Sequence, residues 1–247
     1  MTPENIAVLV TSISALLGAV AWPMALVVLV VIFRKELRSV AGRVPMIMDR
    51  VQSVKIGALE AQLDELARAV PEDANNAGVV TAEQVKVAAK VEVAAREIGQ
   101  PELLAQMDRL SIEYDTLRRT MAGGSRRTSM MTKIVVQMRG LSSSVSDAIE
   151  AYKSSGSPGS RLAAVVMMQM EPKKADLMWL VGRFGRETPF VFYHAALAIQ
   201  NVANGASASE LPKVIDSARE ALDILQGFSG KPDENTVHVL QAIIQAG

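Results

Sequence analysis

A chain of 247 residues is long enough for one or two domains. Its 26 basic side chains equal its 26 acidic ones in number, and this zero net charge argues against nucleic acid as a partner. The absence of cysteine excludes disulfides, thiolate chemistry and cysteine-ligated zinc. Aromatic residues are scarce at 4%, and Ala, Val, Leu and Met supply most of the apolar content, which is typical of packed helices. We therefore expect an all-α fold.

The first 33 residues predict a transmembrane anchor. The range 5–33 contains no charged side chain, and 6–33 is almost continuously apolar. A helix over 6–33 would be about 42 Å long, more than the ~30 Å hydrocarbon core of a bilayer. A cleaved signal peptide is the rival interpretation, because Ala19–Ala21 has the form of a cleavage site. The anchor over residues 1–33 is favoured, since no Lys or Arg precedes the apolar run and the run continues past Ala21.

Charges beside the anchor predict its orientation. Glu4 is the only charged side chain before the span, whereas basic side chains cluster directly after it: Arg34, Lys35, Arg38 and Arg43. Because basic flanks stay on the cytoplasmic side, we expect the N-terminus outside the membrane and the C-terminal domain in the cytoplasm.

Two small residues within the anchor offer an oligomer contact. Ser14 and Gly18 lie one helical turn apart, and such a small-xxx-small pair lets two helix backbones approach closely. The pair predicts a homo-oligomer formed through the span. The alternative is that the pair has no partner, because small residues are common in spans.

Residues 34–153 are predicted to be mostly helical. Residues 34–70 are predicted to form a juxtamembrane amphipathic helix. The basic first half of this helix could lie against anionic lipid headgroups, although a helix exposed to solvent explains the sequence equally well. The polar, Gly- and Pro-bounded segment 71–80 reads as a linker. Residues 81–153 predict a helical hairpin region, because apolar stripes at helical spacing flank a Gly-Gly break: 103–121 before it and 131–152 after it.

Residues 154–247 predict a C-terminal helical domain. Residues 154–160 are Ser-, Gly- and Pro-rich and form a turn. Short helices follow, most of them closed by Gly or Pro: 161–170, 175–184, 189–204, 209–226 and 233–245. Short helices joined by turns suggest an α-α superhelix of the HEAT or TPR type, although no strict repeat period is visible.

Several segments resemble a helical module appended to bacterial conflict-system proteins: Ser157–Val165, Trp179-Leu180, Glu187–Ala198, Glu113–Asp115 and Arg127-Thr128. In addition, Lys55–Ala61 is similar to a juxtamembrane stretch of single-span bacterial proteins associated with anti-phage defence. The resemblance implies a bacterial inner-membrane protein with a role in defence, and it implies no catalytic residue.

A basic loop is the first candidate binding site. Its four arginines bracket Gly123-Gly124: Arg118, Arg119, Arg126 and Arg127. Glycine-rich turns before a helix present backbone N–H groups, so the loop could bind phosphate or an anionic partner. A solvated loop without a ligand is the alternative. The spacing is not that of a P-loop.

His194 is the second candidate. It lies in a segment that is apolar nearly all round. A functional interpretation makes it an acid–base or pH-sensing group beside Glu187 or Tyr193, whereas the simpler interpretation, which we favour, makes it a histidine of the core. His238 is expected at the surface.

The sequence leaves two function classes open. The first is a membrane-anchored interaction or signalling module whose cytoplasmic helices bind a protein partner, within a defence system. The second is an oligomeric membrane effector that perturbs the bilayer on activation. We expect no enzyme, cofactor or metal, since no nucleophile–base set, carboxylate pair or cofactor loop is visible.

Overall fold

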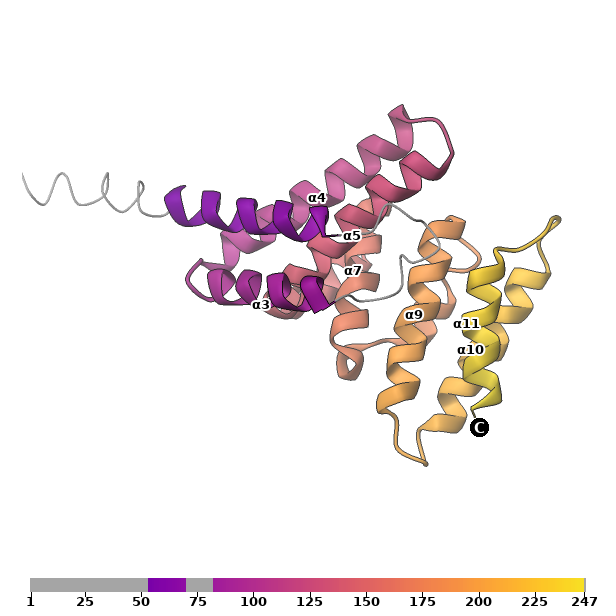
Figure 1. Cartoon of the computed structure of the whole chain (residues 1–247). Coiled ribbons are helices and arrows are strands. Elements are labelled where there is room, and N and C mark those ends of the chain that lie inside the picture. The colour runs from indigo at the N-terminus through magenta and orange to yellow at the C-terminus, as the bar shows by residue number, and fades with distance from the viewer. Residues whose placement is uncertain (1–52, 70–81, 247) are drawn as a thin grey trace, which may run out of the picture. The chain divides into compact units, whose positions relative to one another are not determined.

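Helices account for every regular element of the part of the chain that is described. The computed structural model describes residues 53–69 and 82–246, and over these ranges the predicted all-α class is confirmed. Residues 53–68 are helical, and eleven further elements follow (Figure 1): α3 Ala82–Arg96, α4 Gln100–Thr120, α5 Ser125–Val145, the 3-10 turn η2 Ser146–Ala148, α6 Ile149–Lys153, α7 Pro158–Met170, η3 Pro172–Lys174, α8 Leu177–Val181, α9 Pro189–Gly205, α10 Leu211–Gln226 and α11 Glu234–Gln245.

Three predicted segments fall wholly or partly outside these ranges. The anchor over 1–33, with Ser14 and Gly18, and the linker over 71–80 lie outside the described residues, as do residues 34–52 of the predicted juxtamembrane helix. Within 53–69 and 82–246, no helix combines the length and the apolar character needed to cross a membrane. Contacts between Cα atoms divide the chain into units at residues 1–54 and 55–247, and the contacts described below are those of the second unit.

The helix over residues 53–68 and α3 cover one end of this unit. Leu59, Leu63 and Leu66 of the first helix are buried, as the apolar spacing predicts. Both helices approach α5 at Gly140, where an added Cβ would lie 3.1 Å from Cδ2 of Leu66 and 3.2 Å from Cγ1 of Val91. The glycine therefore lets two helices pack closely against the same turn of α5.

The predicted hairpin is formed by α4 and α5, which pack against each other along their apolar stripes. Gly124 has φ of 151° in the turn between them, a conformation that suits glycine. One detail differs from the prediction. The second stripe is not a single helix to Tyr152, because η2 interrupts it and α6 carries Tyr152 into the core as a separate turn.

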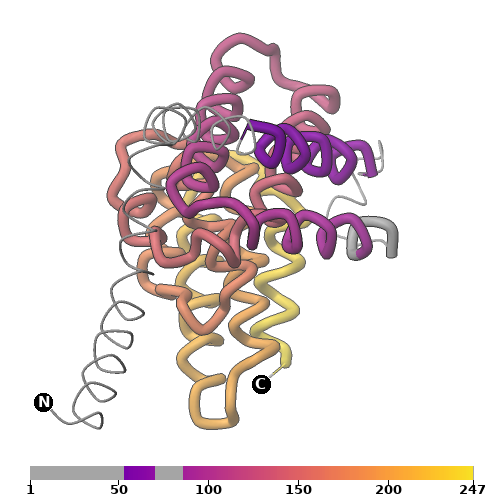
Figure 2. The backbone as a smooth tube through the Cα atoms, turned by 90° about the vertical axis from the view of Figure 1, so that its left-hand side faces the viewer, coloured from indigo at the N-terminus to yellow at the C-terminus, as the bar shows by residue number. Residues whose placement is uncertain are grey.

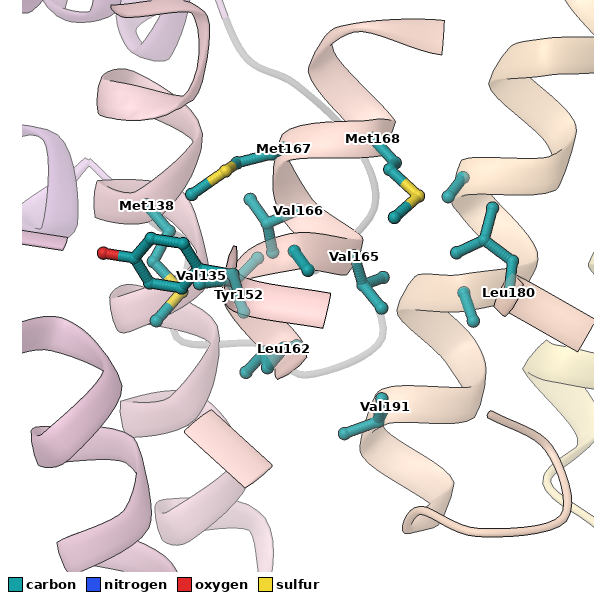
Figure 3. Close-up of a cluster of buried hydrophobic side chains, with 14 of the residues drawn as sticks. Val135, Met138, Tyr152, Leu162, Val165, Val166, Met167, Met168, Leu180 and Val191 are labelled. Atoms are coloured by element: carbon teal, nitrogen blue, oxygen red, sulfur yellow. The ribbon is translucent and has the colours of Figure 1, made fainter. Parts of the chain in front are cut away.

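The central element is α7, which is buried on all sides. Residues 162–169 are all buried, and α7 packs against α4, α5, α6 and α9. Figure 3 shows that Met167 lies on the side of Met138 and Tyr152, whereas Met168 lies on the side of Leu180 and Val191. Apolar side chains of α7 therefore face α5 and α6 on one side and α8 and α9 on the other. In this way α7 joins the helices on its two sides into one core.

The last three long helices, α9, α10 and α11, run side by side in both views (Figures 1 and 2) and contact one another. The predicted helix over 175–184 is shorter than expected. The Asp176 side chain accepts a hydrogen bond from the Trp179 amide at 3.0 Å and so starts α8 as a new helix, which ends before Gly182. This short helix places Trp179 next to the candidate site.

Candidate functional site: a cationic pocket beside Trp179

The site is built around the first turn of α7, which is capped from another helix. Ser157 precedes the helix, and its Oγ accepts a hydrogen bond from the Ser160 amide at 3.2 Å. The same hydroxyl donates to Oδ2 of Asp115 in α4 at 2.5 Å, and the Gly159 amide donates to Oδ1 of Asp115 at 2.8 Å. A carboxylate at a helix N-terminus is favourable, so Asp115 fixes where α7 begins relative to α4.

Close contact between α4 and α7 also requires glycine. A Cβ added at Gly159 would lie 2.1 Å from the carbonyl oxygen of Ser111. No side chain fits at that distance, so only glycine lets the two helices approach this closely. The turn predicted from Ser, Pro and Gly content is therefore also the place where α4 and α7 pack closely against each other.

Arg161 joins this turn to the segment that precedes α9. Its Nε and Nη2 donate to the two carboxylate oxygens of Glu187, while its Nη1 donates to the carbonyl oxygens of Ser155 at 3.1 Å and Gly156 at 2.8 Å. The Glu187 side chain is 4% exposed. A two-pronged guanidinium–carboxylate pair at this depth holds both partners in one geometry.

Arg183 is the second cation on Glu187 and lies against Trp179. Its Nη1 donates to Oε1 of Glu187 at 3.3 Å, and its Nε donates to the carbonyl oxygen of Trp179 at 3.2 Å. The guanidinium carbon is 4.2 Å from the centroid of the Trp179 ring, within cation–π range. Burial lowers the pKa of Arg183; Glu187 opposes this, whereas Arg161 and Arg186 lower that pKa further.

These side chains surround a pocket of about 410 Å³, lined by Lys153, Arg161, Trp179, Arg183, Arg186 and Glu187. Four basic side chains thus face a single carboxylate. Lys153 also pairs outside the lining, with Asp176 at 2.8 Å and Glu150 at 2.9 Å. Burial opposes its charge, but these hydrogen bonds outweigh burial and raise the pKa of Lys153. The lining remains positively charged, which suits an anionic ligand.

An exposed apolar side chain lies next to Trp179 in the sequence. Met178 is 84% exposed, although it is not part of the pocket lining. Arg186 is exposed as well, and within the described ranges it forms no ion pair. Trp, Met and Arg are the residue types enriched where proteins bind one another. The site therefore combines positive charge with exposed apolar surface.

The four arginines of the predicted basic loop do not share one pocket. Arg118 donates to Oγ1 of Thr188 at 3.1 Å, and Arg127 folds back to donate to the carbonyl oxygen of Met121 at 3.0 Å. Arg119 and Arg126 are exposed. Arg118 and Arg119 line a pocket of about 360 Å³ together with Asp115 and Pro158. The loop thus contributes positive charge near the start of α7, but its four arginines do not converge on one anion-binding site.

His194 lies in the core, with 1% of its surface exposed. Phe190 contacts its ring edge-to-face at a centroid distance of 4.7 Å, and Gln169 donates to its carbonyl oxygen at 2.5 Å. Burial lowers its pKa well below the usual value, and the charge of Arg139 lowers that pKa further. Tyr193 lies beside it, but Glu187 is bound to the arginines instead. His238 is exposed.

Neither a metal site nor a relative is found. Over residues 53–69 and 82–246, no group of three or more His, Asp or Glu side chains could hold a metal ion. Searches of protein-family models, curated proteins and solved structures return no match to this chain. The argument for function therefore depends on the geometry of the site.

Sequence reasoning did not select Lys153, Arg183 and Arg186 as site residues. Lys153 ends α6, whereas Arg183 and Arg186 follow α8, and only the fold brings these two segments to one pocket. One signal was present, because Arg183 and Glu187 have the four-residue spacing of a helical ion pair.

Proposed function

We propose that this protein is a membrane-anchored interaction module whose pocket beside Trp179 binds an acidic segment of a cytoplasmic protein partner. The observation that carries the proposal is the lining of that pocket, with four basic side chains and one buried carboxylate around an aromatic ring. The partner's carboxylates pair with Arg186 and the other cations, and an apolar side chain of the partner packs on Met178 and Trp179.

The rigidity of the pocket supports a binding role. Glu187 holds two guanidinium groups, and the Trp179 carbonyl fixes one of them against the indole ring. Side chains that are already ordered lose little conformational entropy when a ligand arrives. Arg186 is the exception, because it is exposed and supplies charge that no described carboxylate neutralises.

The membrane setting is part of the same proposal. It is supported by the charge-free segment before Phe33 and by the basic cluster after it, which orients the C-terminal domain toward the cytoplasm. The succession of helices from α7 to α11 would act as a superhelix-like support for the pocket. The resemblance to conflict-system modules suggests a bacterial inner membrane and a partner from a defence system.

The alternative, an oligomeric effector that perturbs the bilayer, depends on Ser14 and Gly18. Those residues lie outside the described ranges. The Trp179 pocket is a feature that a binding module uses and that a bilayer-perturbing span does not require. We therefore prefer the interaction module.

Binding can be tested with the full-length chain in nanodiscs of neutral lipid. The probe is a fluorescently labelled peptide of alternating Glu and Leu, and the readout is its anisotropy. We expect saturable binding that weakens as salt rises, because the contact is between opposite charges near the surface. Trp179→Ala should weaken binding about thirtyfold or more, the loss typical of a central aromatic contact.

A charge reversal separates this site from general electrostatic attraction. Arg186→Glu should weaken binding at least tenfold, whereas Lys213→Glu, an equal charge change at an exposed position of α10, should leave it nearly unchanged. Equal losses in the two variants would mean that any basic surface residue contributes equally to peptide binding and that the pocket is not the binding site.

A further inference from the structure

A second pocket, separate from the one beside Trp179, lies among residues 53–68, α3, α5 and the end of α7. Its volume is about 390 Å³, within the range of about 300–1,000 Å³ common for small-molecule sites. Leu66, Ala88, Val136 and Met170 give it a mainly apolar lining. Gly140, where two helices pack closely against α5, also lines this pocket.

Arg139 places a positive charge in this apolar lining. Its Nε donates to Oε1 of Gln169 at 3.2 Å, and within the described ranges it forms no ion pair. The other charged residue of the lining, Glu92, pairs instead with Arg96 at 2.6 Å. Burial lowers the pKa of Arg139, and the neighbouring ring of Tyr193 partly opposes this effect. The pocket therefore contains a cation without a counterion.

The Arg139 side chain is only partly buried, so solvent reaches it in the empty pocket. Its one hydrogen bond within the described ranges is the bond from Nε to Gln169. A guanidinium group binds a carboxylate or phosphate through two parallel hydrogen bonds, so Arg139 can receive the head of such an anion.

We propose that this pocket binds an amphipathic monoanion, with a carboxylate or phosphate head on Arg139 and a short apolar tail against Leu66, Val136 and Met170. Ser143 and Ser144 line the same pocket, and their hydroxyl groups form no hydrogen bonds with described residues, so they can donate to the head. Free alkyl carboxylates and anionic membrane lipids share this chemistry. The proposal does not depend on the Trp179 pocket.

The test uses the full-length chain in phosphatidylcholine nanodiscs, titrated with butanoate, hexanoate and octanoate by calorimetry. Each added methylene should tighten binding about fourfold until the tail fills the pocket. Octanamide, which has the same tail and an uncharged head, should bind at least tenfold more weakly than octanoate. Hydrogen exchange should show that octanoate protects residues 136–144.

Arg139→Met is the critical variant. It should abolish octanoate binding, because it removes the positive charge that binds the head and keeps an unbranched side chain in the lining. Arg126→Met, at an exposed position of the same helix, should leave octanoate binding unchanged. Ser143→Phe keeps Arg139 and fills the pocket, so it should also abolish binding and serves if the first variant fails to fold.

The source of the ligand is distinguished by lipid composition. If phosphatidylglycerol nanodiscs protect residues 136–144 without octanoate, and only when Arg139 is present, the ligand is a membrane lipid; if only octanoate protects them, it is a free carboxylate. Either result supports the proposal. Equal binding of octanamide and octanoate, unchanged binding by Arg139→Met, or no binding of any probe would overturn it.

Discussion

Gly159 shows how a single residue constrains two helices. A methyl carbon added at this position would lie 2.1 Å from the Ser111 carbonyl oxygen, so Gly159→Ala must push α4 and α7 apart. We expect the substitution to lower the free energy of unfolding by about 2 kcal/mol or more, the scale of overpacking in a core. Chemical denaturation of the full-length chain measures the change.

Gly156 is the matched control for that experiment. It lies in the same turn, and an added Cβ there would meet nothing within 4 Å. Gly156→Ala should change the free energy of unfolding by less than about 1 kcal/mol, since only backbone freedom is affected. If both variants were equally stable, the close contact between α4 and α7 would be wrong.

His194 predicts a specific pH dependence of stability. Burial and Arg139 hold its pKa in the folded state well below 6.5, whereas the unfolded chain titrates near 6.5. Below pH 6.5 the unfolded state therefore binds a proton that the folded state does not. Stability is lost as the pH falls through this window, by up to about 1.4 kcal/mol per pH unit.

Replacing the histidine tests this linkage. His194→Gln should remove that part of the slope between pH 6.5 and 5, whereas His238→Gln, at an exposed position, should retain it. Unfolding free energies measured across this pH range give both slopes. An unchanged slope in the His194 variant would show that this imidazole binds protons equally in the folded and unfolded states, contrary to a lowered pKa.

At the scale of elements, the ion pairs of Glu187 connect α7 to the segment that leads from α8 to α9. Glu187→Gln would leave two guanidinium groups, one buried and one partly buried, without a full counter-charge. Breaking a buried ion pair from one side costs about 3–5 kcal/mol of stability. Glu150→Gln, whose side chain is 81% exposed, should cost less than about 1 kcal/mol in the same denaturation assay. Similar losses in the two variants would contradict a structural role for Glu187.

Long apolar stripes made most of the helices predictable. The stripes around Leu63, Met107 and Ile134 identify the buried faces of three helices, because a helix repeats every 3.6 residues. The interruption at η2 and the late start of α8 were not predictable in this way. They depend on local capping, such as that by Asp176, which competes with periodicity over only a few residues.

The candidate site was harder to predict from the sequence than the fold was. The arginines around Gly123-Gly124 are conspicuous in sequence, yet each of Arg118 and Arg127 bonds to a different oxygen of the protein. Lys153 and Arg186, by contrast, are inconspicuous in sequence and meet only because α6 and α8 both contact the core around α7 and α9. Proximity of this kind depends on tertiary packing, which periodicity does not specify.

At the scale of the whole molecule, the anchor and the pocket make a joint prediction. The full-length chain should remain with the membrane fraction after carbonate extraction, because a charge-free segment of this length is costly to leave in water. A cytoplasm-dependent reporter fused after residue 247 should be active, and a periplasm-dependent one should be silent. Recovery of the chain in the soluble fraction without detergent, or the reverse reporter pattern, would contradict the anchored arrangement.

The most direct test of the central claim is photo-crosslinking in living cells. A photoreactive amino acid replaces Met178, the exposed residue next to Trp179 in the sequence, or, as a control, Val93, which is exposed on α3. We predict one discrete adduct with a protein that carries an acidic segment, formed from position 178, absent from position 93 and lost when Arg186→Glu is added. An adduct of equal yield from both positions, or one that persists in the Arg186→Glu variant, would contradict the assignment of the Trp179 pocket as the binding site.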